Sequence, residues 1–138
     1  MNIRNGIRGL LALGGLFFLG WLWVVDDRSP TIFITAEEFR LTPDTTTLPA
    51  FQETRVVIRN QGKERHRIDG TLLKRHAVVL TGESTIGRDT NGNYVNLEPG
   101  QSVMVQVTLP QGMYTVRCLI QGHGGMEGVV LVTEEKKS

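Results

Sequence analysis

Short apolar segments separated by turn residues recur along most of this chain, and they restrict its fold more than any other feature. Ser102–Leu109 shows the pattern most clearly, because it alternates between apolar and polar residues (SVMVQVTL). In a strand, this order places Val103, Val105 and Val107 on one face. A period of two predicts β-strands that turn one face toward a core, so the chain is expected to be all-β.

The other candidate strands are short runs in which Val, Ile or an aromatic residue recurs. They are Thr31–Thr35, Arg55–Arg59, Ala77–Leu80, Tyr94–Leu97, Met113–Cys118 and Gly128–Val132. Several such strands with regular turn signals predict an antiparallel β-sandwich. Residues 81–93 are polar and rich in Gly and Thr, which favours a loop. One folded domain over residues 28–138 is therefore expected.

The N-terminal segment differs in character, because residues 10–25 form an uncharged apolar run (LLALGGLFFLGWLWVV). As a helix rising ~1.5 Å per residue, this run would span roughly 24 Å, close to the ~30 Å hydrocarbon core of a membrane. Arg4 and Arg8 precede the run, and two aspartates at positions 26 and 27 follow it. Cationic residues stay in the cytoplasm, so the domain that follows is expected on the periplasmic or other extracytoplasmic side.

The sequence thus predicts one N-terminal transmembrane helix, with residues 1–27 as an uncleaved anchor in the cytoplasmic membrane. A cleaved signal peptide is the alternative. It is disfavoured because the apolar run leads into Trp-Leu-Trp-Val-Val-Asp-Asp, which lacks the small residues of a cleavage site. Both interpretations place the domain outside the cytoplasm.

Charge and cysteine content exclude several classes of protein. The chain carries 15 Lys and Arg against 14 Asp and Glu, without the basic surface typical of a nucleic-acid binder. Cys118 is its one cysteine, which rules out a disulfide within the chain. A lone thiol is a small buried residue, a reactive nucleophile or a metal ligand, and the neighbouring residues must decide between these roles.

The segment that follows Cys118 favours a metal ligand. The spacing Cys118-x4-His123-x2-Met126 puts a thiolate, an imidazole and a thioether on one loop between two candidate strands. Soft sulfur combined with imidazole suits copper, and two His and one Cys with a weak axial Met form the ligand set of electron-transfer copper sites. Glycines at positions 122, 124 and 125 would let this loop fold tightly around an ion.

The second imidazole must come from elsewhere in the chain. His66 is the better candidate, since it follows the turn after the strand 55–59, whereas His76 lies in a basic stretch and is interpreted as a surface residue. Zinc is the main rival metal, but it rarely takes a thioether ligand. A cysteine hydrolase is disfavoured because Cys118 would face the apolar side of its strand.

Residues 31–133 resemble the cupredoxins, a family of copper proteins. The resemblance rests on residues 34–39 (ITAEEF), 60–66 (NQGKERH) and 97–100 (LEPG), and on Tyr114-x3-Cys118-x4-His123-x2-Met126-x-Gly128. It implies a Greek-key β-sandwich that binds one type 1 copper ion. It also implies His66, Cys118 and His123 as equatorial ligands, with Met126 as the axial ligand.

These features predict a membrane-tethered copper protein that transfers single electrons between redox partners, with no catalytic residues and no small-molecule substrate. A cytochrome or a terminal oxidase is the expected partner. Two alternatives stay open: a periplasmic accessory protein for copper or iron trafficking, and a structural module associated with an oxidase.

The path of the electron is also predicted from the loop. His123 lies among glycines, so one edge of its ring is expected near solvent with little side-chain cover, as the electron exit. Lys63, Arg65 and Arg67 flank His66 and would form a basic rim that steers an acidic partner.

Overall fold

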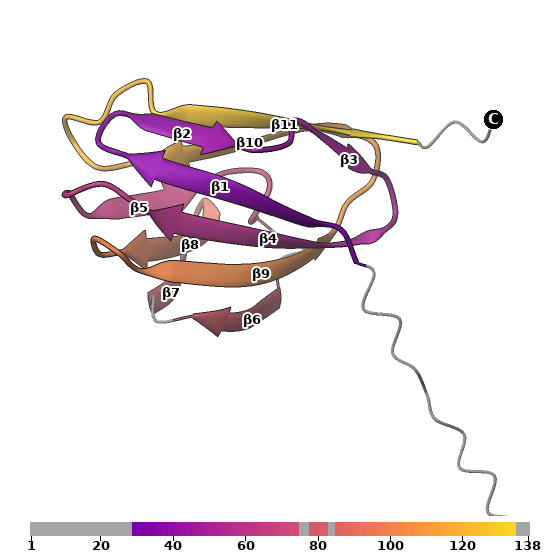
Figure 1. The fold of residues 1–138 in the computed structure, drawn as a ribbon, viewed down its shortest axis with the longest axis horizontal. Coiled ribbons are helices and arrows are strands. Elements are labelled where there is room, and N and C mark those ends of the chain that lie inside the picture. The colour runs from indigo at the N-terminus through magenta and orange to yellow at the C-terminus, as the bar shows by residue number, and fades with distance from the viewer. Residues whose placement is uncertain (1–28, 75–77, 83–84, 135–138) are drawn as a thin grey trace, which may run out of the picture.

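The computed structural model describes residues 29–74, 78–82 and 85–134, which form two packed β-sheets (Figure 1). The first sheet has the strand order β2 (Arg40–Pro43), β1 (Thr31–Glu37), β4 (Glu53–Asn60), β9 (Ser102–Thr108) and β6 (Val78–Gly82). The second has the order β3 (Thr47–Pro49), β11 (Glu127–Thr133), β10 (Gly112–Cys118), β5 (His66–Asp69), β8 (Gly92–Leu97) and β7 (Thr85–Asp89). The predicted all-β sandwich is confirmed.

Both sheets are mixed, so the expectation of a purely antiparallel sandwich is wrong. Strand β1 runs parallel to β4, with Thr31 opposite Arg55, and β11 runs parallel to β3. The reason lies in the connections. Strand β2 folds back on β1, and β3 then crosses to the other sheet before the chain returns as β4. When the chain comes back to the first sheet as β4, it runs in the same direction as β1, so the two strands pair in parallel.

The core forms where the alternating strands face each other between the sheets. Val103, Val105 and Val107 of β9 are all buried, as their alternation predicts. Strand β4 lies beside β9 and buries Val56 and Ile58 on the same side. Burying apolar area at about 25 cal/mol per Å² drives this packing.

The prediction of a loop over residues 81–93 is wrong for the described part of that range, because residues 85–89 form strand β7 and β8 begins at Gly92. Strand β7 pairs with β8 in an antiparallel hairpin that ends the second sheet. A strand at a sheet edge can be polar, because one of its faces meets solvent, and this explains the missing apolar signal. The ring of Tyr94 covers Gly87, where a Cβ atom would lie 2.2 Å from that ring. The short strand β5 also escaped prediction.

Several predicted features lie outside the described residues. These are the anchor, residues 1–27, and His76. Within the part of the chain that the structure describes, no helix is long and apolar enough to cross a membrane.

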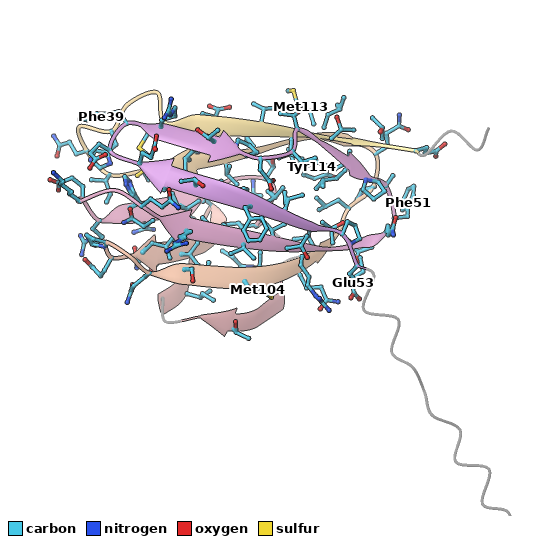
Figure 2. The ribbon with its side chains drawn as sticks, viewed as in Figure 1. Phe39, Phe51, Glu53, Met104, Met113 and Tyr114 are labelled. Carbon is cyan, nitrogen blue, oxygen red and sulfur yellow. The ribbon has the colours of Figure 1, made fainter. Side chains whose placement is uncertain are left out.

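The two ends of the sandwich differ in what they carry. Strand β10 ends at Cys118 and β4 ends at Asn60, and the turn with Phe39 lies at this same end (Figure 2). Phe51 and Glu53 lie at the opposite end, where the described chain begins. His66 follows the turn after β4, and His123 lies in the loop after β10. The three predicted equatorial ligands, His66, Cys118 and His123, therefore gather at the end marked by Phe39.

Candidate metal centre

Cys118 is the last residue of β10, and the loop that follows folds back on it. Its side chain is 8% exposed and faces the core, as predicted from the alternation of the strand. Its backbone N–H donates to the carbonyl of Met126 at 3.0 Å, which closes the loop. Gly122 and Gly125 take φ values of 92° and 85°, a region that glycine enters without strain. The sulfur is therefore fixed at the rim of the core.

His66 opens strand β5, which pairs with β10 and β8. Ile68 lies opposite Cys118, and His66 itself lies opposite Leu97. Its side chain is completely buried. The sheet therefore carries His66 to Cys118 from 52 residues away in the sequence.

The three side chains converge through specific atoms. The Sγ atom of Cys118 lies 3.6 Å from Nδ1 of His66 and 3.6 Å from Nδ1 of His123. All three donor atoms lie within 4.8 Å of one another. A metal bonds nitrogen at about 2.0 Å and sulfur at about 2.3 Å, so a single ion can bridge atoms that are 3.6 Å apart. One thiolate with two imidazoles is a donor set that suits copper, and the cluster fits a single copper ion.

Burial also prepares His66 as a ligand. Loss of water around the ring lowers the pKa of His66 below its ordinary value, and the neighbouring His123 lowers it further. The negative charges of Glu38 and Glu64 oppose this lowering of the pKa, because they favour the charged imidazolium. A neutral imidazole keeps the lone pair that a metal requires.

Met126 lies in the same loop and is 2% exposed. Its backbone N–H donates to the carbonyl of His123 at 3.2 Å, and its own carbonyl accepts from Cys118. Backbone hydrogen bonds thus connect Met126 to both ligand candidates of the loop, and its burial keeps the thioether away from water.

Asn60 holds the segment that leads to His66, and the sequence reasoning did not single it out. Its Nδ2 donates to the carbonyls of Glu64 at 2.7 Å and Leu97 at 3.0 Å. Its Oδ1 accepts the N–H of Gly62 at 2.9 Å. The signal that could have revealed it is the Asn-x-Gly turn, since an Asn side chain commonly accepts from the backbone two residues on.

The expectation of little side-chain cover over His123 is wrong. The side chain is 8% exposed, because the ring of Phe39 packs edge-on against it at 5.8 Å between centroids. Phe39 comes from the turn between β1 and β2 and is itself 72% exposed (Figure 2). The space beside the loop glycines is open, but an aromatic residue from a distant segment of the chain covers the ring of His123.

Only two of the three residues predicted to form a basic rim are exposed. Lys63 and Arg65 are exposed, whereas Arg67 is half-buried, pairs with Asp89 and stacks 3.7 Å above the ring of Tyr94. The carbonyl of Arg67 accepts the N–H of Leu119 at 3.0 Å. Arg67 therefore ties the strand of His66 to the loop after Cys118.

An ion pair also connects β5, the strand of His66, to β10, the strand of Cys118. The buried carboxylate of Asp69 in β5 accepts from Nε of Arg117 in β10 at 2.9 Å. These residues lie opposite each other in the sheet, one position before Cys118. The pair raises the pKa of Arg117, because the carboxylate stabilises the charged guanidinium.

Solved structures of other proteins share this arrangement of strands. An auracyanin from the photosynthetic bacterium Roseiflexus castenholzii, reduced with sodium dithionite, is 27% identical, with a TM-score of 0.52 over 76% of this chain and 98% of its own. Auracyanin B is 20% identical, with a TM-score of 0.52 over 75% of this chain and 88% of its own. The fold is cupredoxin-like.

This cupredoxin-like domain also matches parts of larger copper proteins. The multicopper oxidase McoA from Aquifex aeolicus is 15% identical, with a TM-score of 0.58 over 78% of this chain but 30% of its own. The chain thus spans about a third of that oxidase. No family model and no curated protein matches the sequence.

Proposed function

We propose that this protein is a membrane-tethered, type 1 copper protein that carries single electrons between redox partners outside the cytoplasm. His66, Cys118 and His123 would bind the ion as equatorial ligands, with Met126 as the weak axial ligand. When bound, the ion would supply a one-electron redox couple. The protein's own part would be to hold the three donors close together in the folded chain.

Closure of the site is the observation that carries this proposal. His66, Cys118, His123 and Met126 are each at most 8% exposed. A substrate molecule would need an open position on the metal, as catalytic zinc sites provide, and burial of all four side chains opposes that access. An electron needs no such opening. Burial therefore favours a carrier over an enzyme, and the similar auracyanin was studied in a chemically reduced form.

A trafficking protein would be expected to release its ion more readily. The four side chains here are buried, and hydrogen bonds that involve Asn60, Arg67 and Asp69 hold the strands and turns that carry them. Such rigidity supports retention of the metal through a redox cycle rather than transfer of the metal to another protein.

The test uses the full-length protein in detergent with one equivalent of Cu(II). Strong visible absorption and a narrow copper hyperfine splitting in the electron paramagnetic resonance spectrum are expected. Ascorbate should bleach the colour, and reoxidation should restore it without loss of copper. Cys118→Ser should abolish the absorption, whereas Met113→Leu, an exposed control, should preserve it. Metal lost in each cycle would contradict a carrier role.

The proposal also includes a membrane anchor and a redox partner. The apolar run 10–25 would stay in the mature protein as the anchor, and the redox partner would be a cytochrome or a terminal oxidase. Mass spectrometry of membrane-extracted protein tests the anchor, since a mature N-terminus at or beyond residue 26 would refute it. Electron transfer to candidate partners at several ionic strengths tests the partner, and neutralising Lys63 and Arg65 should weaken the salt dependence.

A further inference from the structure

One surface feature at the end opposite the metal centre is unexplained by copper binding. We call this the tether end and define it by residues 29–30, 51–53 and 109–112. Phe51 lies there beside Glu53, close to the point where the described chain begins (Figure 2). The N–H of Phe51 donates to the carbonyl of Leu109 at 2.8 Å, which joins two of the three segments.

Phe51 is unfavourable in two ways within the domain. Its φ is 57°, and it is the single residue other than glycine with a positive φ among the described residues. Bulky side chains are strained in this region, whereas glycine is not. In addition, 67% of the residue is exposed, so the ring gains little from packing. Strain and exposure together make the ring a candidate for contact with a surface outside the domain.

The start of the chain indicates what that contact is. The carbonyl of Pro30 accepts the N–H of Arg55 at 2.9 Å, and Ser29 donates to Glu53 at 3.3 Å. Residues 29–30 are thus fixed beside the start of β4, two residues after Phe51. The apolar run ends at Val25, and the four steps from there to Ser29 extend at most about 14 Å.

That distance is small on the scale of a membrane surface. The headgroup region adds roughly 5–8 Å to each side of the hydrocarbon core. An anchored run would therefore hold the tether end against the headgroups. Aromatic side chains insert favourably at this depth, and Pro110 and Gln111, which follow Leu109 in the chain, are uncharged. Glu53 is exposed at the same end, which favours a zwitterionic surface over an anionic one.

We propose that the tether end rests on the phospholipid surface of its own membrane, with Phe51 inserted among the headgroups. The inference depends on the membrane anchor of the proposed function and adds an orientation to it. Strand β4 has eight residues and leads from the tether end toward the metal centre. At about 3.3 Å per residue it holds the centre roughly 26 Å farther from the bilayer. A redox partner would have to present its cofactor at that height.

The experiment uses full-length protein in phosphatidylcholine vesicles with and without bromine on the acyl chains near the headgroups, since bromine quenches nearby tryptophan. Phe51→Trp is placed in a Trp21→Phe/Trp23→Phe background, where it is the one tryptophan. Phe39→Trp in the same background is the matched control, because Phe39 is equally exposed but lies at the metal end. Thermal unfolding of both variants checks that they fold.

Bromine should remove much of the emission of Trp at position 51 and leave that at position 39 unchanged. Equal quenching at both positions would overturn the inference, because the domain would lie on its side. A blue-shifted emission at position 51 that bromine does not quench would also overturn the inference, because protein would then cover the ring.

The original tryptophans separate the inference from the anchor on which it depends. In the unsubstituted protein, Trp21 and Trp23 should be quenched by bromine. If they are quenched and position 51 is not, the orientation is wrong and the anchor stands. If they are not quenched, the anchor fails and the orientation fails with it.

Discussion

Asn60 offers the sharpest test of how the fold supports the metal centre. The substitution Asn60→Ala removes three hydrogen bonds at once, to Gly62, Glu64 and Leu97. The bonds to Gly62 and Leu97 are buried, whereas the one to Glu64 is partly open to water. Because a buried group left without a partner costs about 1–3 kcal/mol, two such groups should destabilise the metal-free protein by about 2–6 kcal/mol.

The measurement is urea unfolding of the metal-free, full-length protein in detergent, followed by circular dichroism. Asn93→Ala is the matched control, because its Nδ2 makes one partly buried hydrogen bond, to the carbonyl of Leu73 at 3.2 Å. That bond contributes about 1 kcal/mol or less. In a thermal scan, the loss for Asn60→Ala corresponds to a Tm lower by roughly 8–24 °C, at about 4 °C per kcal/mol.

The reasoning would be refuted if the two alanine variants unfolded at the same urea concentration with equal slopes. The bonds of Asn60 would then contribute no more than that of Asn93, and the turn before His66 would have to be held by backbone contacts alone. Asn60→Asp adds a second check. It keeps the acceptor for Gly62 but loses both donated bonds, so it should remain clearly less stable than the parent protein.

Three further outcomes are expected. Met126→Leu should retain copper and raise the reduction potential, because an axial thioether tunes the potential more than it holds the ion. Redox titration measures the potential, and Met113→Leu, at an exposed position, is the control that should leave it unchanged. Gly125→Ala should cost about 1–2 kcal/mol, because its φ is 85° and the strain is purely backbone, whereas Gly124→Ala should cost almost nothing by the same unfolding assay. Asp69→Asn should lower stability by about 1–2 kcal/mol through its weakened bond to Arg117, and stability that does not change would show that the pair contributes nothing measurable.

Much of the local structure followed from the order of residues. Alternation in Ser102–Leu109 predicted both a strand and its buried face, because side chains in a strand alternate strictly between two sides. The same rule placed Cys118 toward the core. The spacing Cys118-x4-His123-x2-Met126 predicted a metal loop, because ligands that are close in sequence can meet through a short turn.

Other features depended on contacts between distant segments. The parallel pairing of β1 with β4 follows from where β2 and β3 are placed, and no local pattern encodes that choice. Strand β7 escaped prediction because an edge strand needs no apolar face. Phe39 covers His123 from 84 positions earlier in the chain, the separation between residues 39 and 123.

The difference between the features that the sequence predicted and those that it did not has a physical cause. Covalent neighbours fix periodicity, turn chemistry and ligand spacing, so the sequence by itself determined the all-β class and the donors Cys118 and His123 as partners on one loop. Distances between segments depend on how two sheets pack. Tertiary structure alone therefore decided that Nδ1 of His66 lies 3.6 Å from the sulfur, that Asn60 holds the approach to it, and that Phe51 is left exposed at the other end.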